Sequence, residues 1–214
     1  MRHATVRRDD SRSLPPMGMD RVQAILREYH ERDARRTQPD TLRQCTEALS
    51  GLESDSAEKR TAAATTLGEL RYLHTYEPLL NALARECQPP SGERMEDAAT
   101  GESKPVFGNR AVKAAILKAL DNIGNDHAGQ RALAAGREPL KEFSMAHLDD
   151  AGLVRAALKA SAWTVSIMGD AIHDLDEVKE AARSAAAKDG SDAEKYRATE
   201  GAAVNLYFDW IRSR

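Results

Sequence analysis

The amino-acid sequence predicts an all-helical protein, and three observations carry that prediction. Alanine, which has the highest helix propensity, provides 36 of the 214 residues. Residues that favour strands are scarce, because the chain has only 8 Val, 6 Ile and 5% aromatic residues. Apolar residues recur along successive segments at the i, i+3, i+4 and i+7 spacing of one helix face. The net charge of −3 is too small for a disordered chain of this composition.

Composition and charge also exclude several classes of protein. No run of about 18 apolar residues is present, so we expect no membrane association through a spanning helix. Two cysteines, Cys45 and Cys87, are too few for a disulfide framework and favour a reducing, cytoplasmic location. An isoelectric point near 6.1 argues against nucleic-acid binding, and the excess of arginine is confined to residues 1–36.

The domain organisation follows from where the helical period begins. Residues 1–19 combine arginines with Pro15 and Pro16 and show no apolar period, which predicts a disordered N-terminal tail. A transit peptide is the alternative, against which the two acidic residues at 9 and 10 count. We expect residues 20–214 to form one helical domain. Its first helix begins at Asp20.

Three further helices are expected before residue 88. Asp40, after Pro39, is placed to cap a helix, and Asp55 with Glu58 resembles a capping box that opens the next one. Pro78 falls in the first turn of the third, where its missing N–H costs nothing. The apolar residues expected to face inward on these helices are Leu42, Cys45, Leu49, Leu52, Ala63, Leu67, Leu70, Tyr76, Leu79, Leu80, Leu83 and Cys87.

Residues 88–108 interrupt the helical pattern. Three of the eight prolines and three glycines fall in this segment, together with several acidic residues. A connection of this length is unusual in a compact domain, so we predict a flexible insertion, with a binding loop as the alternative.

The helical pattern resumes at residue 109. One apolar stripe runs to Gly124, a short segment closes at Gly136, and Pro139 opens another helix. We then expect one long helix from Leu153 to Ala171, another from Leu175 to Lys188, and a last one from about Ala193 to Arg212.

Three of these helices can be superimposed on one another at offsets of 53 and 42 residues. Matching Arg60, Lys113 and Arg155 also matches small residues two positions later and aliphatic residues further along. The matched small residues are Ala62, Ala115 and Ala157, where we expect neighbouring helices to approach closely. Such a recurrence is typical of stacked helical repeats, in which each unit buries its face against the next.

The chain here resembles the armadillo/HEAT superfamily. Residues 57–83 resemble a HEAT-type helix pair, and residues 119–165 are more similar to an armadillo repeat. The resemblance implies a right-handed alpha-solenoid of stacked armadillo/HEAT-like repeats. It further implies a protein-interaction adaptor or assembly factor, without catalysis of its own.

Motifs for catalysis are weak. The chain has no H-x-x-x-H, nucleotide-binding or G-x-S-x-G pattern, and we assign no catalytic, cofactor or metal residue. The best cluster is His173 beside Asp170, Asp174 and Asp176, expected at a helix end. It carries the alternative function, a HEAT-like enzyme subunit or lyase-type chaperone. Both cysteines are interpreted as buried, inert thiols.

Two partner-binding residues are predicted in the middle of the chain. Asn122 matches the asparagine with which peptide-binding armadillo proteins clamp a partner's backbone, but Glu69 and Thr164 occupy the equivalent sites. A folded domain or a short motif is therefore the expected protein partner. Trp163 lies on a second apolar face of the helix predicted over 153–171, either between neighbouring helices or facing a groove.

The C-terminal helix supplies the other two partner-binding candidates, Phe208 and Trp210. Four of the ten aromatic residues fall in the last 19 positions, where a solenoid normally has a polar cap. We expect Leu206 and Phe208 to lie off the inward stripe, so that this helix offers a binding surface or a homodimer interface. The residues of the expected inward stripe are Ala203, Val204, Tyr207, Trp210 and Ile211.

Overall fold

The computed structural model describes residues 38–87, 94–96, 103–105, 107–128, 130–164 and 168–212. The chain divides into two compact units, residues 1–42 and 43–214. The predicted tail (1–19) and the helix predicted to begin at Asp20 lie outside the described residues, and the architecture below is that of residues 43–214.

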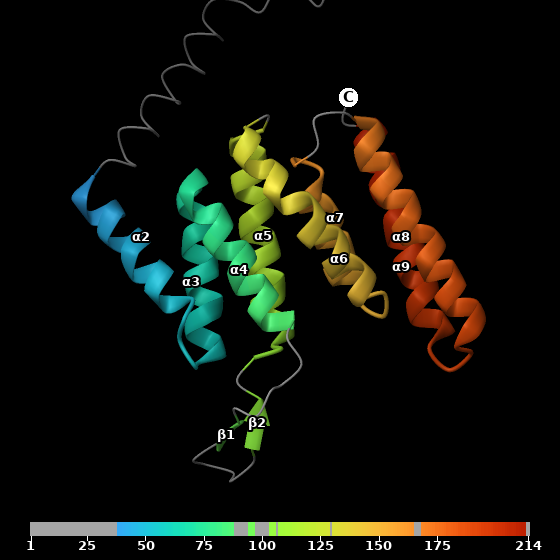
Figure 1. Ribbon diagram of the computed structural model, residues 1–214, viewed down its shortest axis with the longest axis horizontal. Helices are drawn as coiled ribbons and strands as arrows, with labels where there is room; N and C mark the ends of the chain where they lie inside the picture. The colour runs from blue at the N-terminus through green and yellow to red at the C-terminus, as the bar shows by residue number, and fades with distance from the viewer. Residues whose placement is uncertain are drawn as a thin grey trace, which may run out of the picture. The chain divides into compact units, whose positions relative to one another are not determined.

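The described residues confirm the all-helical prediction. They form eight α-helices and two short 3-10 helices, η1 (Leu73–Thr75) and η2 (Arg131–Gly136) (Figure 1). None of these helices combines the length and the apolar character that crossing a membrane requires. The α-helices are α2 (Pro39–Gly51), α3 (Ala57–Leu70), α4 (Tyr76–Cys87), α5 (Arg110–Asp126), α6 (Arg137–Ala146), α7 (Ala151–Ser161), α8 (Met168–Lys188) and α9 (Ala193–Arg212).

The start of α3 differs from the prediction by one residue. Ser56, not Asp55, is the N-cap, and its hydroxyl oxygen accepts a hydrogen bond from the Lys59 amide at 3.3 Å. The Ser56 hydroxyl in turn donates to Glu58 at 2.7 Å. Three residues after this cap stands a lysine, so the predicted reciprocal capping box does not form.

Of the apolar residues predicted to face inward on α2, α3 and α4, most are buried, Leu49 and Leu70 are half-buried, and two are exposed. Leu42 is 48% exposed, and the Cys87 thiol at the end of α4 is exposed rather than buried. Glu86, which has no apolar signature, occupies the buried position next to it. Glu86 is buried because an arginine from another helix pairs with it, and the local sequence does not reveal this partner.

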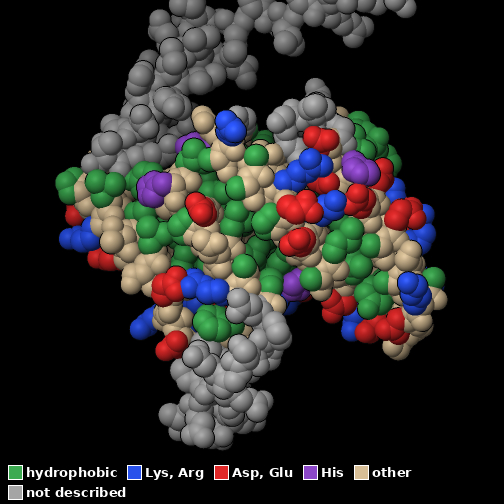
Figure 2. All heavy atoms as spheres, viewed as in Figure 1, with side chains coloured by type: hydrophobic (Ala, Val, Ile, Leu, Met, Phe, Trp, Pro, Cys, Tyr) green, Lys and Arg blue, Asp and Glu red, His purple; other side chains and the backbone are tan. Residues whose placement is uncertain are grey.

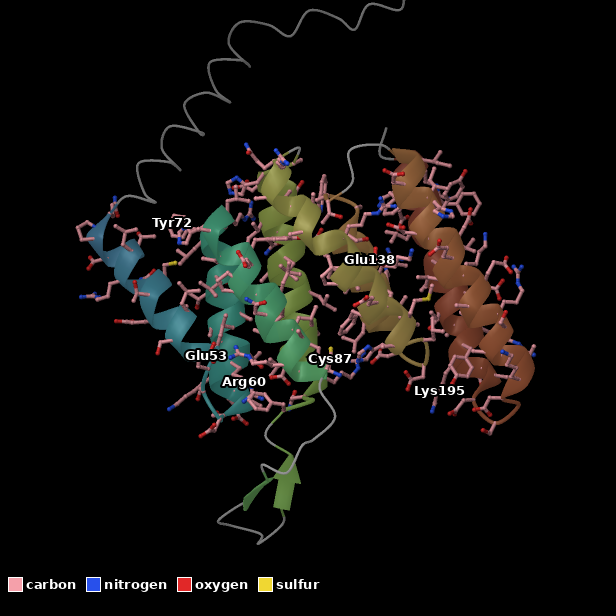
Figure 3. The ribbon with its side chains drawn as sticks, viewed as in Figure 1. Glu53, Arg60, Tyr72, Cys87, Glu138 and Lys195 are labelled. Carbon is pink, nitrogen blue, oxygen red and sulfur yellow. The ribbon has the colours of Figure 1, made fainter. Side chains whose placement is uncertain are left out.

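That partner is Arg60 on α3, and the two side chains form a buried joint. Arg60 Nε donates to Glu86 Oε1 at 2.7 Å, and the side chains are 2% and 1% exposed. The other carboxylate oxygen accepts the backbone N–H groups of Gly108 and Asn109, at 2.8 and 3.0 Å. Figure 3 shows Arg60 and Cys87 at the same end of the helices. Strands β1 and β2, between α4 and α5, lie beyond this end. The Arg60–Glu86 joint therefore ties together both ends of the 88–108 insertion.

The insertion contains regular structure that the sequence did not predict. Strands β1 (Arg94–Glu96) and β2 (Ser103–Pro105) pair antiparallel, with Met95 opposite Lys104. After the insertion, Asn109 caps α5 by accepting the Ala111 amide at 2.9 Å. The insertion thus leads directly into a capped helix.

The long helix predicted over Leu153–Ala171 is interrupted. α7 ends at Ser161, and α8 begins at Met168. The Thr164 hydroxyl and amide both donate to the Ser161 carbonyl, at 2.6 and 2.9 Å, which closes a turn in place of another helical bond. Apolar residues recur on both sides of this break, and Ala171 and Leu175 of α8 are buried.

Two apolar clusters form the core, and α7 belongs to both. One face of α7 contacts α5 and α6 and places Leu153, Ala157 and Ala160 in the first cluster. The adjacent face, with Val154 and Leu158, packs with α8 and α9. A central helix between two neighbours is one of the two arrangements predicted for this segment. The second cluster consists of Val154, Leu158, Leu175, Val178, Ala203 and Leu206.

A close helix contact occurs away from the predicted alanine positions. Of the three matched residues, Ala157 is buried, Ala115 is half-buried and Ala62 is exposed. The backbones of α3 and α5 instead approach at Gly68, where an added Cβ would lie 2.7 Å from the Cα of Ala119. A glycine is required there because any side chain would collide with the facing helix.

Candidate functional site

The strongest candidate site is the exposed side of α9. The opposite side of this helix buries Thr199, Ala203 and Leu206. The Thr199 hydroxyl also donates to the carbonyl of Leu148 at 2.7 Å. These contacts fix which way the helix faces, and they correct the predicted inward stripe: Leu206 is buried, whereas Ile211 is 54% exposed.

Phe208 is exposed as predicted. Within residues 43–214, Phe208 (48%) and Ile211 are the large apolar side chains that the described part of the chain leaves exposed. Together with half-buried Val204, they are spaced i, i+4 and i+7, so they share one face of α9. We call the line Arg197, Gly201, Val204, Phe208 and Ile211 the α9 outer face.

The α9 outer face is held on a rigid support. The Tyr207 and Phe208 rings meet edge to face, with centroids 5.7 Å apart. Arg155 of α7 donates to Asp209 at 2.8 Å, and Trp210 packs against the second apolar cluster. Of the two predicted partner-binding residues on this helix, Trp210 therefore anchors it and Phe208 presents a free apolar surface.

Charges at the two ends of this face are unsatisfied. Arg197 and Arg212 are exposed, and neither makes an ion pair or hydrogen bond within the part of the chain that the structure describes. Their neighbours differ, because Glu200 is held by Arg183 at 2.6 Å and Lys195 by Asp192 at 2.8 Å. The α9 outer face is thus apolar in its centre and has an arginine near each end.

The other two predicted partner-binding residues make internal contacts. The Asn122 amide donates to the carbonyl of Gly68 at 3.3 Å, across the α3–α5 contact. Trp163 Nε1 donates to Asp121 at 2.8 Å, and its indole covers Gly124, where an added Cβ would lie 2.8 Å away. Both side chains are half-buried and make contacts within the protein.

The residues around His173 do not converge on a catalytic or metal site. They lie in the N-terminal part of α8, with Asp170 in its first turn, and His173 Nε2 is 3.0 Å from Glu177. Asp174 is buried and accepts hydrogen bonds from Nε and Nη2 of Arg137, at 2.9 and 3.0 Å. Figure 2 shows the mixture of acidic and basic side chains that results on this part of the surface. Among the described residues, no three His, Cys, Asp or Glu side chains are grouped so as to hold a metal ion.

The sequence did not predict two contacts between titratable side chains. The buried Cys45 thiol lies 3.7 Å from His74 Nε2, although the two are 29 positions apart in the chain. Burial raises the pKa of the Cys45 thiol, so it stays protonated and is a poor nucleophile. Lys113 Nζ lies 2.8 Å from His147 Nε2, while the other ring nitrogen contacts the Phe143 carbonyl at 2.9 Å. No local sequence pattern predicts either contact, because each joins residues that are far apart in the chain and meet only in the folded protein.

Comparison with protein-family models, with curated proteins and with solved structures finds no match to this chain.

Proposed function

We propose that this protein is a cytoplasmic, non-enzymatic interaction adaptor of armadillo/HEAT-like architecture that holds a protein partner on the α9 outer face. The observation that carries the proposal is the exposure of Phe208 and Ile211 side by side on a helix whose other side is fully packed. Aromatic side chains on a rigid support are typical anchors of protein interfaces, and adaptors need such surfaces rather than reacting groups.

Two further features support an adaptor. The two cysteine thiols are poor nucleophiles, because desolvation raises the pKa of Cys45 and of Cys87. The polar side chains of the predicted groove, Asn122 and Trp163, are engaged in packing. Binding through an outer helix face leaves this packing undisturbed, so partner binding needs no rearrangement of the core.

The proposal is tested by comparing two exposed apolar residues in the full-length chain. Phe208→Ser should weaken partner capture from a native extract by about 30-fold, since an anchor of this kind contributes about 2 kcal/mol. Leu42→Ser, on a side chain that is equally exposed, is the matched control and should leave capture unchanged. Both variants should melt like the wild type. Unchanged capture with Phe208→Ser, or a fall in melting temperature typical of a core mutation, would refute the proposal.

A further inference from the structure

The α9 outer face has the geometry of a helix-pairing seam. Its residues Arg197, Gly201, Val204, Phe208 and Ile211 follow one another at alternating intervals of four and three. This is the heptad spacing with which one helix packs lengthwise along another. An added Cβ at Gly201 would meet no atom within 4 Å, so the seam has open space beside Val204 into which a side chain of a second helix fits.

The charges along this seam select the partner. Arg197 lies within the seam and Arg212 directly follows Ile211 at its end. Both are exposed, and both lack an acidic partner among the described residues. Exposed Glu194, one turn before Arg197, is the one carboxylate near the seam that no described basic residue binds. The surface around the apolar centre is therefore positive on balance.

A second copy of the chain does not complement this pattern. In a parallel pairing, Arg197 of one copy would face Arg197 of the other. In an antiparallel pairing centred between Val204 and Asn205, Arg197 would face Arg212. Like charges that face each other across a helix pair are unfavourable and direct pairing toward another partner.

We infer that the partner segment is an acidic amphipathic helix, whose apolar stripe packs on Val204, Phe208 and Ile211 and whose flanking carboxylates meet Arg197 and Arg212. This inference rests on the proposed function and adds the chemical class of the partner. The apolar centre supplies affinity, and the arginines supply selectivity for a negatively charged helix.

The test uses two designed helical peptides of about three heptads as probes. Both carry leucine on the seam, and they differ only in the flanking residues, Glu in one and Lys in the other. Binding to the full-length protein is measured by fluorescence anisotropy. We expect the Glu peptide to bind about tenfold more tightly than the Lys peptide, and the difference to shrink at about 1 M salt.

Charge reversal makes the test specific to these residues. In the double variant Arg197→Glu and Arg212→Glu, the preference should invert in favour of the Lys peptide. The control variant, Lys118→Glu with Arg131→Glu, makes the same change of charge at exposed positions on α5 and η2, and should keep the wild-type preference. Phe208→Ser should weaken both peptides alike, because it removes the apolar anchor.

The outcomes separate this inference from the proposed function. Equal binding of the two peptides, lost with Phe208→Ser, would overturn the acidic partner but retain the docking face. Absence of peptide binding, with concentration-dependent self-association that Phe208→Ser abolishes, would show that a second copy occupies the face. If neither peptide binds, the protein is monomeric and Phe208→Ser retains partner capture, both proposals fall.

Discussion

The Arg60–Glu86 and Arg137–Asp174 joints are both arginine–carboxylate pairs, and they differ in how far water reaches them. In the Arg60–Glu86 joint both side chains are buried, and every carboxylate oxygen has a partner within the protein. In the Arg137–Asp174 joint the carboxylate is buried, but the Arg137 side chain is 32% exposed. The first joint lies between α3 and α4, and the second connects α6 with α8.

The contrast shows that one kind of ion pair can have two structural roles. Arg60 also donates to the carbonyls of Ser54 and Asp55, at 2.8 and 2.9 Å, so it closes the α2–α3 connection while Glu86 closes the α4–α5 connection. Arg137 belongs to a surface network instead, in which Lys141 binds Glu177 at 2.5 Å and lies 3.9 Å from Asp174. Replacing the arginine should lower the unfolding free energy strongly in the first joint. In the second joint, Lys141 should offset part of the loss.

The largest expected effect is that of Arg60→Met. It would leave the Glu86 carboxylate buried without its cation, which costs about 3–5 kcal/mol of unfolding free energy. Urea unfolding followed by circular dichroism measures the loss. Glu86→Gln is the companion variant, because it keeps an acceptor for the Gly108 and Asn109 amides without the charge. A loss below about 1 kcal/mol with Arg60→Met would show that water enters the joint and that the contrast with Arg137 is false.

Arg137→Met should have a smaller effect, about 1–2 kcal/mol. Solvent reaches the guanidinium, and Lys141 remains close to Asp174 to offset part of the lost charge. The same urea titration compares the two variants directly. In the double variant Arg137→Met and Lys141→Met, the total loss should exceed the sum of the two single losses, because both cations near Asp174 are then missing. Strict additivity would mean that Lys141 does not substitute for Arg137.

Asp150 tests a third joint, at the start of α7. Arg110 binds this carboxylate at 2.5 and 3.0 Å, and this hydrogen bonding lowers the pKa of Asp150 below its ordinary value. The pair therefore stabilises the fold above a pH of about 4, and its contribution is lost as the pH falls through the lowered pKa. Asp150→Ala, which also removes the helix cap, should cost about 1 kcal/mol near pH 7.

The measurement for Asp150 is the unfolding free energy of wild type and variant between neutral and strongly acidic pH. The difference should shrink steadily at acidic pH, since protonation removes the ion pair from the wild type as well. Asp149→Ala, at the exposed neighbouring position, is the control and should leave the pH dependence unchanged. A constant difference over the whole range would contradict an electrostatic origin.

The smallest effect is expected for Tyr76→Phe. The Tyr76 hydroxyl is buried against Gly136 and has no hydrogen-bond partner within the described structure, in contrast to the fully bonded Glu86. Burial raises the pKa of Tyr76, which keeps it neutral. Removing the hydroxyl should leave the protein equally stable or about 0.5 kcal/mol more stable in thermal unfolding. A clear loss of stability would reveal a partner for this hydroxyl.

The apolar period of the sequence predicted most of the helices because each buries one continuous face. The last helix runs from Ala193 to Arg212 as expected, and Pro78 and Pro139 fall in the first turns of α4 and α6. The period failed after Ser161, where apolar residues continue but the helix does not. There the Thr164 turn and the docking of Trp163 on Gly124 decide the backbone, and neither depends on local periodicity.

The candidate site was predicted only in part. An unusual density of aromatic residues near the C-terminus pointed to Phe208, which is exposed, but the same pattern included Trp210, which packs against the core. A helical wheel places residues relative to one another and leaves open which side faces the protein. The Thr199 bond to Leu148 and the burial of Leu206 settle that rotation, and they expose Ile211 in place of Leu206.

By itself, then, the sequence determined the helical class and most helix boundaries, because helix propensity and apolar spacing act over neighbouring residues. Only the tertiary structure decided which polar residues are buried and with whom they pair. Glu86 and Arg60 are 26 positions apart, and Asn122 and Gly68 are 54 apart, so their contacts exist only once the helices cross. Burial of such groups is favourable only when the folded chain supplies the partner, and no local pattern encodes that condition.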